Sequence, residues 1–125
     1  MSKRETPLTL RFWSEVGGIL IEEFMAVPAG KGQGRRLIDG LIIKSAETQR
    51  TQDNDIEVAG RDLIVVQTKA SRLGMSLLGQ VLFSMELMKP FQPSSIEGVA
   101  VCTKGDLVLE KLAESYGVKV IVYSS

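Results

Sequence analysis

The sequence predicts an α/β fold with a central mixed sheet flanked by helices and the element order αβββαβαβ. Nearly continuous apolar runs, typical of strands covered on both faces, occur in RLIDGLII, DLIVV, GVAV and VKVIVY. A meander of strands followed by alternating helices and strands places helices on the faces of a mixed sheet. The chain has 125 residues, 44% of them hydrophobic, and no linker rich in proline, glycine or serine divides it. We therefore expect a single domain spanning residues 1–125.

The first predicted helix covers residues 9–27, with Thr9 as its N-cap and Pro28 just beyond its end. Its apolar residues recur at helical spacing at Phe12, Val16, Ile19, Leu20 and Phe24. On this helix Glu22 would lie on the polar side, whereas Glu23 would fall in the middle of the apolar stripe. A carboxylate at that position either reaches solvent at the rim or has a functional reason to be there.

The next elements are strands and connections. We expect a loop over residues 28–34, a strand over 35–44 and a polar connection over 45–55. Residues 56–70 then read as two strands joined near residues 59–62, and strands so close in sequence pair antiparallel.

The second half alternates helices and strands. A helix over residues 74–89 stops at Pro90, and a strand follows over residues 95–103. Asp106 is expected to cap a third helix that ends before Gly117, and the last strand covers residues 118–123.

Composition excludes several kinds of site. The chain has no histidine and one cysteine, so histidine-based catalysis, histidine-ligated zinc and multi-cysteine zinc sites are excluded. Cys102 lies in the apolar run GVAVC and is expected to be a core residue. Fifteen basic and fifteen acidic residues give no overall field, so a charged partner must meet a local patch. Without a membrane-spanning stretch or a signal peptide, we expect a cytoplasmic protein and no membrane partner.

Polar residues interrupt two of the predicted strands. Asp39 lies within RLIDGLII, either as a carboxylate fixed at the sheet, where Gly40 allows a bulge, or as a turn residue between two short strands. Gln67 and Lys69 share one face of their strand because side chains alternate. A carboxylate, an amide oxygen and an ammonium converging there would suit a hard divalent cation such as Mg²⁺, with a lysine beside it.

These residues resemble the motif of the PD-(D/E)XK nuclease superfamily, which has the restriction endonuclease-like fold. Ile38-Asp39 resembles the proline–aspartate pair of the superfamily motif, and Gln67-Thr68-Lys69 is similar to the Gln-x-Lys form of Mrr-type endonucleases. The run GVAVCT, the helix after it and GVKVIVY also look like the end of the core in Mrr-like and archaeal resolvase-like members.

The resemblance implies a nuclease that uses Mg²⁺, or Mn²⁺, to hydrolyse phosphodiester bonds of DNA. It makes Asp39 the principal metal ligand, with the Gln67 amide oxygen, the Thr68 carbonyl and Glu23 as further ligands, Glu22 fitting less well than Glu23. Lys69 would polarise the attacking water and offset phosphate charge.

The resemblance also suggests substrate contacts. Gln80 looks like a glutamine that some branches use near the substrate, although a solvated helix residue needs no function. Candidate phosphate contacts, which scattered surface charge explains equally well, are Lys31, Arg35, Arg36, Arg61 and Arg72.

Other functions remain open. Glutamine is a weaker ligand than a carboxylate, so the chain could be a catalytically silent module for nucleic-acid binding or protein assembly. The predicted helix over residues 74–89 is apolar around most of its circumference. This pattern indicates that the helix is either covered on two sides or used in contact with a second copy of the chain, as a homodimer, or with another protein. Met75, Met85 and Met88 would fill the core or the dimer interface. The glycine-rich stretch at residues 30–34 lacks the context of a phosphate loop, and no cofactor motif supports Lys69 as a Schiff-base lysine.

Overall fold

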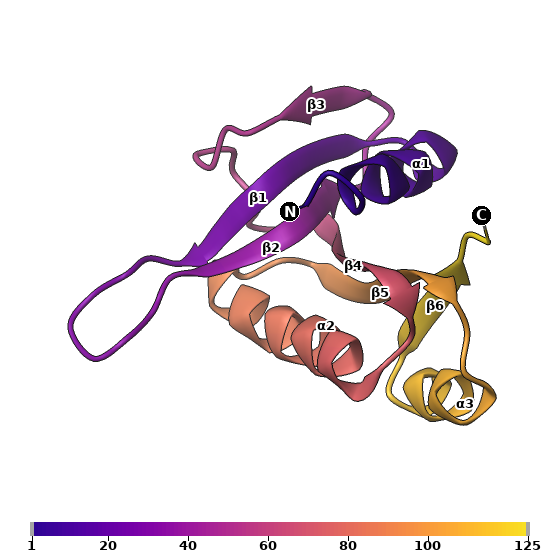
Figure 1. Cartoon of the computed structure of the whole chain (residues 1–125). Helices are drawn as coiled ribbons and strands as arrows, with labels where there is room; N and C mark the ends of the chain where they lie inside the picture. Colours follow the sequence, from indigo (N-terminus) through magenta and orange to yellow (C-terminus); the bar gives the residue numbers. More distant parts are fainter. Residues whose placement is uncertain (1, 125) are drawn as a thin grey trace.

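The computed structural model describes residues 2–124 and confirms the α/β class, with a six-stranded mixed sheet flanked by helices (Figure 1). The chain forms α1 (Thr6–Val16), β1 (Ile19–Val27), β2 (Arg36–Ile43), β3 (Gln49–Thr51), β4 (Asp62–Arg72), α2 (Met75–Met88), a 3-10 turn (Lys89–Phe91), β5 (Ser95–Lys104), α3 (Leu107–Ser115) and β6 (Val118–Val122).

The strand order in the sheet is β3-β1-β2-β4-β5-β6. Strand β2 is antiparallel to both of its neighbours, β1 and β4, whereas β4, β5 and β6 are mutually parallel and β3 is parallel to β1. Figure 1 shows the loop between β1 and β2 projecting away from the body of the sheet.

The two faces of the sheet carry different helices. Ile64 and Val66 of β4 pack with Phe12 of α1 on one face. Leu63 and Val65, one residue out of phase, pack with Met88 of α2 on the other, which α3 also covers. Because both faces are covered, β2, β4 and β5 carry nearly continuous apolar runs, as predicted. The prediction of a strand covered on both sides is wrong for residues 118–122, because β6 is an edge strand and is partly exposed.

The prediction of one helix over residues 9–27 is wrong. The helix ends at Val16, and residues 19–27 form β1. Gly17 and Gly18 have φ values of +73° and +85°, so the chain leaves the helix there. A side chain at Gly18 would meet the carbonyl oxygen of Ile43 at 2.6 Å, so β1 also needs this glycine to approach β2. Thr9 is accordingly not the N-cap: Glu5 is, and Thr9 lies buried within the helix.

The predicted hairpin within residues 56–70 is also wrong. Residues 56–58 form no strand: Ile56 and Val58 contribute side chains to the core from a loop. The antiparallel neighbour of β4 is β2, and the stretch expected to be a polar connection supplies the short edge strand β3. With β1 and β3 included, the order becomes αββββαβαβ.

The elements after β4 follow the prediction closely. Strand β5, helix α3 and strand β6 lie where expected, and the Asp106 side chain accepts a hydrogen bond from the Leu109 N–H at 3.0 Å. Cys102 is a fully buried core residue. Within residues 2–124, no helix has the length and apolar character needed to cross a membrane.

Candidate active site at the fork between strands β2 and β4

Strands β2 and β4 separate at the residues singled out by the sequence. Their ladder runs from Ile43 paired with Leu63 to Gly40 paired with Val66, and there it stops. Beyond it, side chains bridge the strands: the Asp39 N–H donates to Gln67 Oε1 at 3.3 Å, and the Thr68 N–H donates to Asp39 Oδ2 at 2.9 Å. We call Asp39, Gln67, Thr68 and Lys69 the fork.

Gln67 joins three elements. It is 4% exposed, and its Nε2 donates to Ser84 Oγ of α2 at 2.9 Å while its Oε1 accepts from the Asp39 N–H. Both ends of the amide are therefore hydrogen-bonded, although the carbonyl oxygen retains a second lone pair. Gln67 thus fixes the position of Asp39 relative to α2.

Thr68 and Lys69 point to different surroundings. Thr68 is buried, and its hydroxyl shares a 2.8 Å hydrogen bond with the hydroxyl of Thr9 of α1. Lys69 is exposed and, by alternation, lies on the Gln67 side of β4. The strand therefore anchors the fork to both helices and leaves an ammonium at its open end.

Asp39 lies in an environment that disfavours its charge. Burial raises the pKa of its carboxyl group, and the negative charges of Glu23 and Glu5 raise it further, while the Thr68 N–H opposes this effect. A proton, a cation or a cationic side chain at this carboxylate would relieve the repulsion.

Glu23 lies on β1 rather than on a helix. Its neighbours in sequence, Glu22 and Phe24, pair with Gly40 and Ile38, so Glu23 lies level with Asp39. Glu23 has φ of +53°, a conformation that costs about 1–3 kcal/mol for a residue other than glycine. Backbone strain thus occurs beside the fork, where a functional carboxylate was expected.

Glu22 is excluded from the site by its partner. It is 7% exposed and forms an ion pair with Arg50 of β3. This pair ties the edge strand to β1 and explains the buried carboxylate structurally.

Glu5, an acidic residue at the start of α1, was not predicted from the sequence. Its carboxylate accepts hydrogen bonds from the Ser2 hydroxyl at 2.6 Å and the Ala70 N–H at 3.1 Å. The Ser2 hydrogen bond lowers the pKa of Glu5, and the Ala70 N–H and the charge of Lys69 act in the same direction. Pro7, typical of the first helical turn, was the signal that would have placed Glu5 at the helix start.

A groove of about 650 Å³ opens beside the fork, between β2 and α2. We call it the fork groove; its lining consists of Arg36, Leu37, Asp39, Gln67, Gly79, Gln80, Phe83, Ser84, Glu86 and Leu87. Of the predicted substrate contacts, it therefore brings Gln80 and Arg36 together with Asp39.

The other predicted phosphate contacts are dispersed. Lys31 and Arg35 belong to the projecting loop between β1 and β2, and Arg72 ends β4 beside Lys104 of β5. Arg61 precedes β4 and lies at the opposite end of that strand from Lys69. The structure thus separates Arg61 from the fork.

The fork offers few ligands for a metal ion. No group of three or more acidic or cysteine side chains among residues 2–124 is arranged to hold a metal ion. Asp39 offers one carboxylate and Gln67 one amide oxygen, and Mg²⁺ commonly takes one or two carboxylates and completes its shell with water and substrate phosphate. A divalent cation bound at the fork would therefore need water or other oxygen ligands for the rest of its shell.

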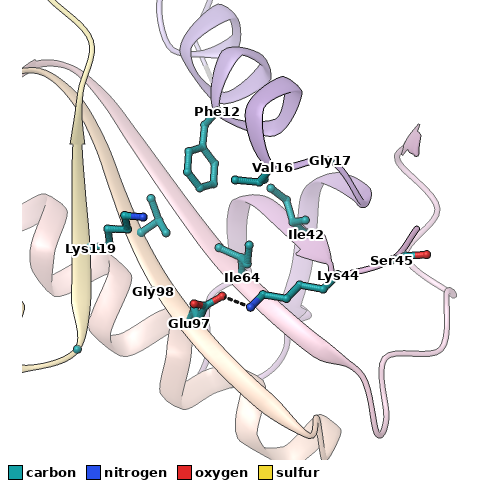
Figure 2. Close-up of a pocket in the computed structure, with 12 residues that line it drawn as sticks. Phe12, Val16, Gly17, Ile42, Lys44, Ser45, Ile64, Glu97, Gly98 and Lys119 are labelled. Atoms are coloured by element: carbon teal, nitrogen blue, oxygen red, sulfur yellow. Dashed lines mark ion pairs between the residues drawn. The ribbon is translucent and has the colours of Figure 1, made fainter. Parts of the chain in front are cut away.

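A second cavity, of about 390 Å³, lies at the other end of the sheet beside α1. Figure 2 shows Lys44 reaching across it to Glu97, with Phe12, Ile42 and Ile64 nearby. The Lys44–Glu97 ion pair measures 2.6 Å, and Glu97 raises the pKa of Lys44. None of the predicted site residues lines this cavity, so the fork remains the candidate active site.

No family model, curated protein or solved structure matches this chain.

Proposed function

We propose that this protein is a Mg²⁺-dependent nuclease of restriction endonuclease-like fold. The observation that carries the proposal is the fork, where β2 and β4 separate, Asp39 lines an open groove, and Lys69 is exposed on the Gln67 side of β4. The topology supports it, because α1, the antiparallel series β1, β2 and β4, α2 and the parallel β5 give the order αβββαβ if the edge strand β3 is set aside. That order is the core implied by the motif's resemblance to the superfamily.

Each residue of the fork has a role in the proposed hydrolysis of a phosphodiester bond. Asp39, with the Gln67 amide oxygen, the Thr68 carbonyl and Glu23, would hold the cation. Bound Mg²⁺ would supply Lewis-acid polarisation of a phosphate oxygen. Lys69 orients the attacking water and stabilises the negative charge that develops on the phosphate. The hydrogen bond from Gln67 to Ser84 keeps Asp39 in register during the reaction.

Basic side chains near the fork support a nucleic-acid partner. Four ion pairs between side chains in residues 2–124 involve Arg11, Lys44, Arg50 and Lys89. None of these pairs uses the basic residues at the fork end of the structure, namely Arg4, Arg36, Lys69, Arg72 and Lys104. Cations outside these ion pairs are available to phosphates, which supply most of the affinity for nucleic acids.

A catalytically silent module is the second candidate, and Gln67 favours it. Glutamine replaces the acidic residue of the superfamily motif, and both ends of its amide are already hydrogen-bonded. In that case the fork would bind nucleic acid, or a protein, without cleaving it.

Cleavage assays distinguish the two candidates. Supercoiled plasmid and single-stranded DNA would be incubated with Mg²⁺ or Mn²⁺ and with wild type, Lys69→Ala and Lys119→Ala, the last removing a lysine at the other end of the sheet. The nuclease proposal predicts cleavage by wild type and Lys119→Ala and its loss in Lys69→Ala. DNA binding without cleavage by wild type would instead support the silent module.

We further propose that the protein forms a homodimer. The sheet and α3 cover one side of α2, where Val81 and Met88 are buried, whereas Met75 and Phe83 of the same helix are 78% and 74% exposed. Exposed apolar residues also lie on α3, where Leu107 and Val108 are 88% and 76% exposed and are suited to a second copy or another protein. Sedimentation showing only monomer well above micromolar concentration would contradict the dimer.

A further inference from the structure

Phe83 is an exposed aromatic residue beside the fork. It is 74% exposed, whereas Phe12, Phe24 and Tyr123 are each less than 10% exposed. A single exposed apolar residue needs no explanation by itself. Phe83, however, lines the fork groove, and Asp39 and Gln67 of the proposed site line the same groove.

The groove around Phe83 combines an apolar platform with polar and charged groups. Gln80, Phe83, Ser84 and Leu87 share one face of α2 because they are three or four residues apart. Arg36 of β2 lines the facing side. The acidic lining residue Glu86 is paired with Lys89 at 2.5 Å, so its charge is partly neutralised.

We propose that the fork groove binds an unpaired nucleotide whose base stacks on Phe83, so that the substrate is single-stranded or locally unpaired nucleic acid. This inference rests on the proposed nuclease function and specifies its substrate class. Stacking of bases on aromatic side chains in a basic groove is how proteins bind single strands without sequence preference. Gln80 offers amide groups to the edge of the base, and Arg36 in the lining offers a cation to its phosphates.

The volume and position of the groove agree with this occupant. About 650 Å³ lies within the range of roughly 300–1,000 Å³ found for small-molecule sites. In a duplex both faces of a base are stacked on its neighbours, so a base can stack on Phe83 only after it leaves the helix. The groove therefore selects unpaired bases beside Asp39, which belongs to its lining.

Binding assays without divalent metal test the inference separately from cleavage. Fluorescein-labelled oligothymidylate and a duplex of the same length would be titrated with wild type, Phe83→Leu and Phe83→Trp. Phe83→Leu keeps an apolar side chain but removes the stacking surface, and Phe83→Trp retains it. Tyr116→Leu is the matched control, since Tyr116 is 62% exposed and lines a different groove, between α2 and α3.

Wild type should bind the oligothymidylate more tightly than the duplex. Phe83→Leu should weaken oligothymidylate binding roughly 5- to 150-fold, the range for loss of one stacked base, and should leave duplex binding unchanged. Phe83→Trp should retain the affinity, and Tyr116→Leu should match wild type.

Other results would overturn the inference in distinguishable ways. If Phe83→Leu leaves oligothymidylate affinity unchanged while Lys69→Ala still abolishes cleavage, the nuclease proposal stands and the stacking site falls. If light scattering shows that Phe83→Leu dissociates a dimer, Phe83 belongs to a protein interface. If wild type binds neither probe, both the inference and the nucleic-acid function fall.

Discussion

Replacement of Gln67 by glutamate restores the acidic residue of the superfamily motif and should cost stability in the absence of metal. The two side chains have nearly the same shape, so Oε1 can still accept from the Asp39 N–H, and the Ser84 hydroxyl can rotate to donate to the other oxygen. Hydrogen bonding is therefore preserved in Gln67→Glu. What changes is that a carboxylate enters a position that is 4% exposed, beside the Asp39 carboxylate.

The size of the effect follows from the protonation equilibrium. The cost cannot exceed that of holding the new carboxyl group neutral, which at pH 7 is about 3.7 kcal/mol from an unfolded-state pKa of about 4.3. Burial and Asp39 raise the folded-state pKa, so we expect Gln67→Glu to lose about 1–3.7 kcal/mol at pH 7. Because a raised carboxyl pKa destabilises the fold only above the unfolded-state pKa, the loss should shrink as pH falls towards about 4.3.

Urea unfolding of wild type and Gln67→Glu at several pH values measures this difference. Mg²⁺ should recover part of the lost stability, since a ligand that binds only the folded state stabilises it by mass action. Nuclease activity should rise if the proposed site is correct. A stability difference that does not change with pH, together with no effect of Mg²⁺, would refute the proposed role of Gln67 as a buried group beside Asp39 and the metal.

Three further predictions concern the scaffold. Gly79→Ala should raise the free energy of unfolding by about 0.5–1 kcal/mol, because an added Cβ there meets no atom within 4 Å and alanine favours the helix. Urea titration measures this difference, and a destabilised variant would contradict the prediction. Thr9→Val should lower the free energy of unfolding by about 1–3 kcal/mol, because it leaves the Thr68 hydroxyl unsatisfied. In a double-mutant cycle, Thr9→Val/Thr68→Val should recover part of that loss. Strictly additive losses would argue against the shared hydrogen bond. Burial and the 2.7 Å hydrogen bond to Glu15 raise the pKa of Tyr123 to about 12, so its phenol should ionise in an ultraviolet titration only above its usual range. The stability that the neutral phenol contributes is present below about pH 10 and is lost as pH rises towards 12. Ionisation of all tyrosines near pH 10 in the folded protein would contradict the raised pKa of Tyr123.

The sequence predicted the fork because its signal is local. An apolar run ending in Gln67 and Lys69 on one strand face, and an aspartate interrupting another run, can be read by alternation alone. The structure brings these two segments together because β2 and β4 are neighbours in the sheet. The pairing partner of β4, in contrast, depends on tertiary structure, which explains why the hairpin within residues 56–70 was predicted instead.

The first half of the chain could not be assigned from periodicity. ILIEEFMAV is apolar at positions that fit both a helix and a strand covered on both faces, so its pattern does not decide between them. The adjacent glycines at 17 and 18 were the better signal, since both adopt positive φ where the helix ends. The partner of Glu22 was beyond sequence reasoning altogether, because β3 reaches β1 only through the fold.

The most direct test of the central claim, that the fork is a metal-dependent catalytic site, is a calorimetric titration of Mn²⁺ and Mg²⁺ into wild type, Asp39→Asn and Glu23→Ala. We predict weak binding by wild type that Asp39→Asn abolishes and Glu23→Ala weakens, with all three proteins folded by circular dichroism. Undiminished binding in Asp39→Asn, or no binding by wild type at millimolar metal with nucleic acid present, would contradict the claim.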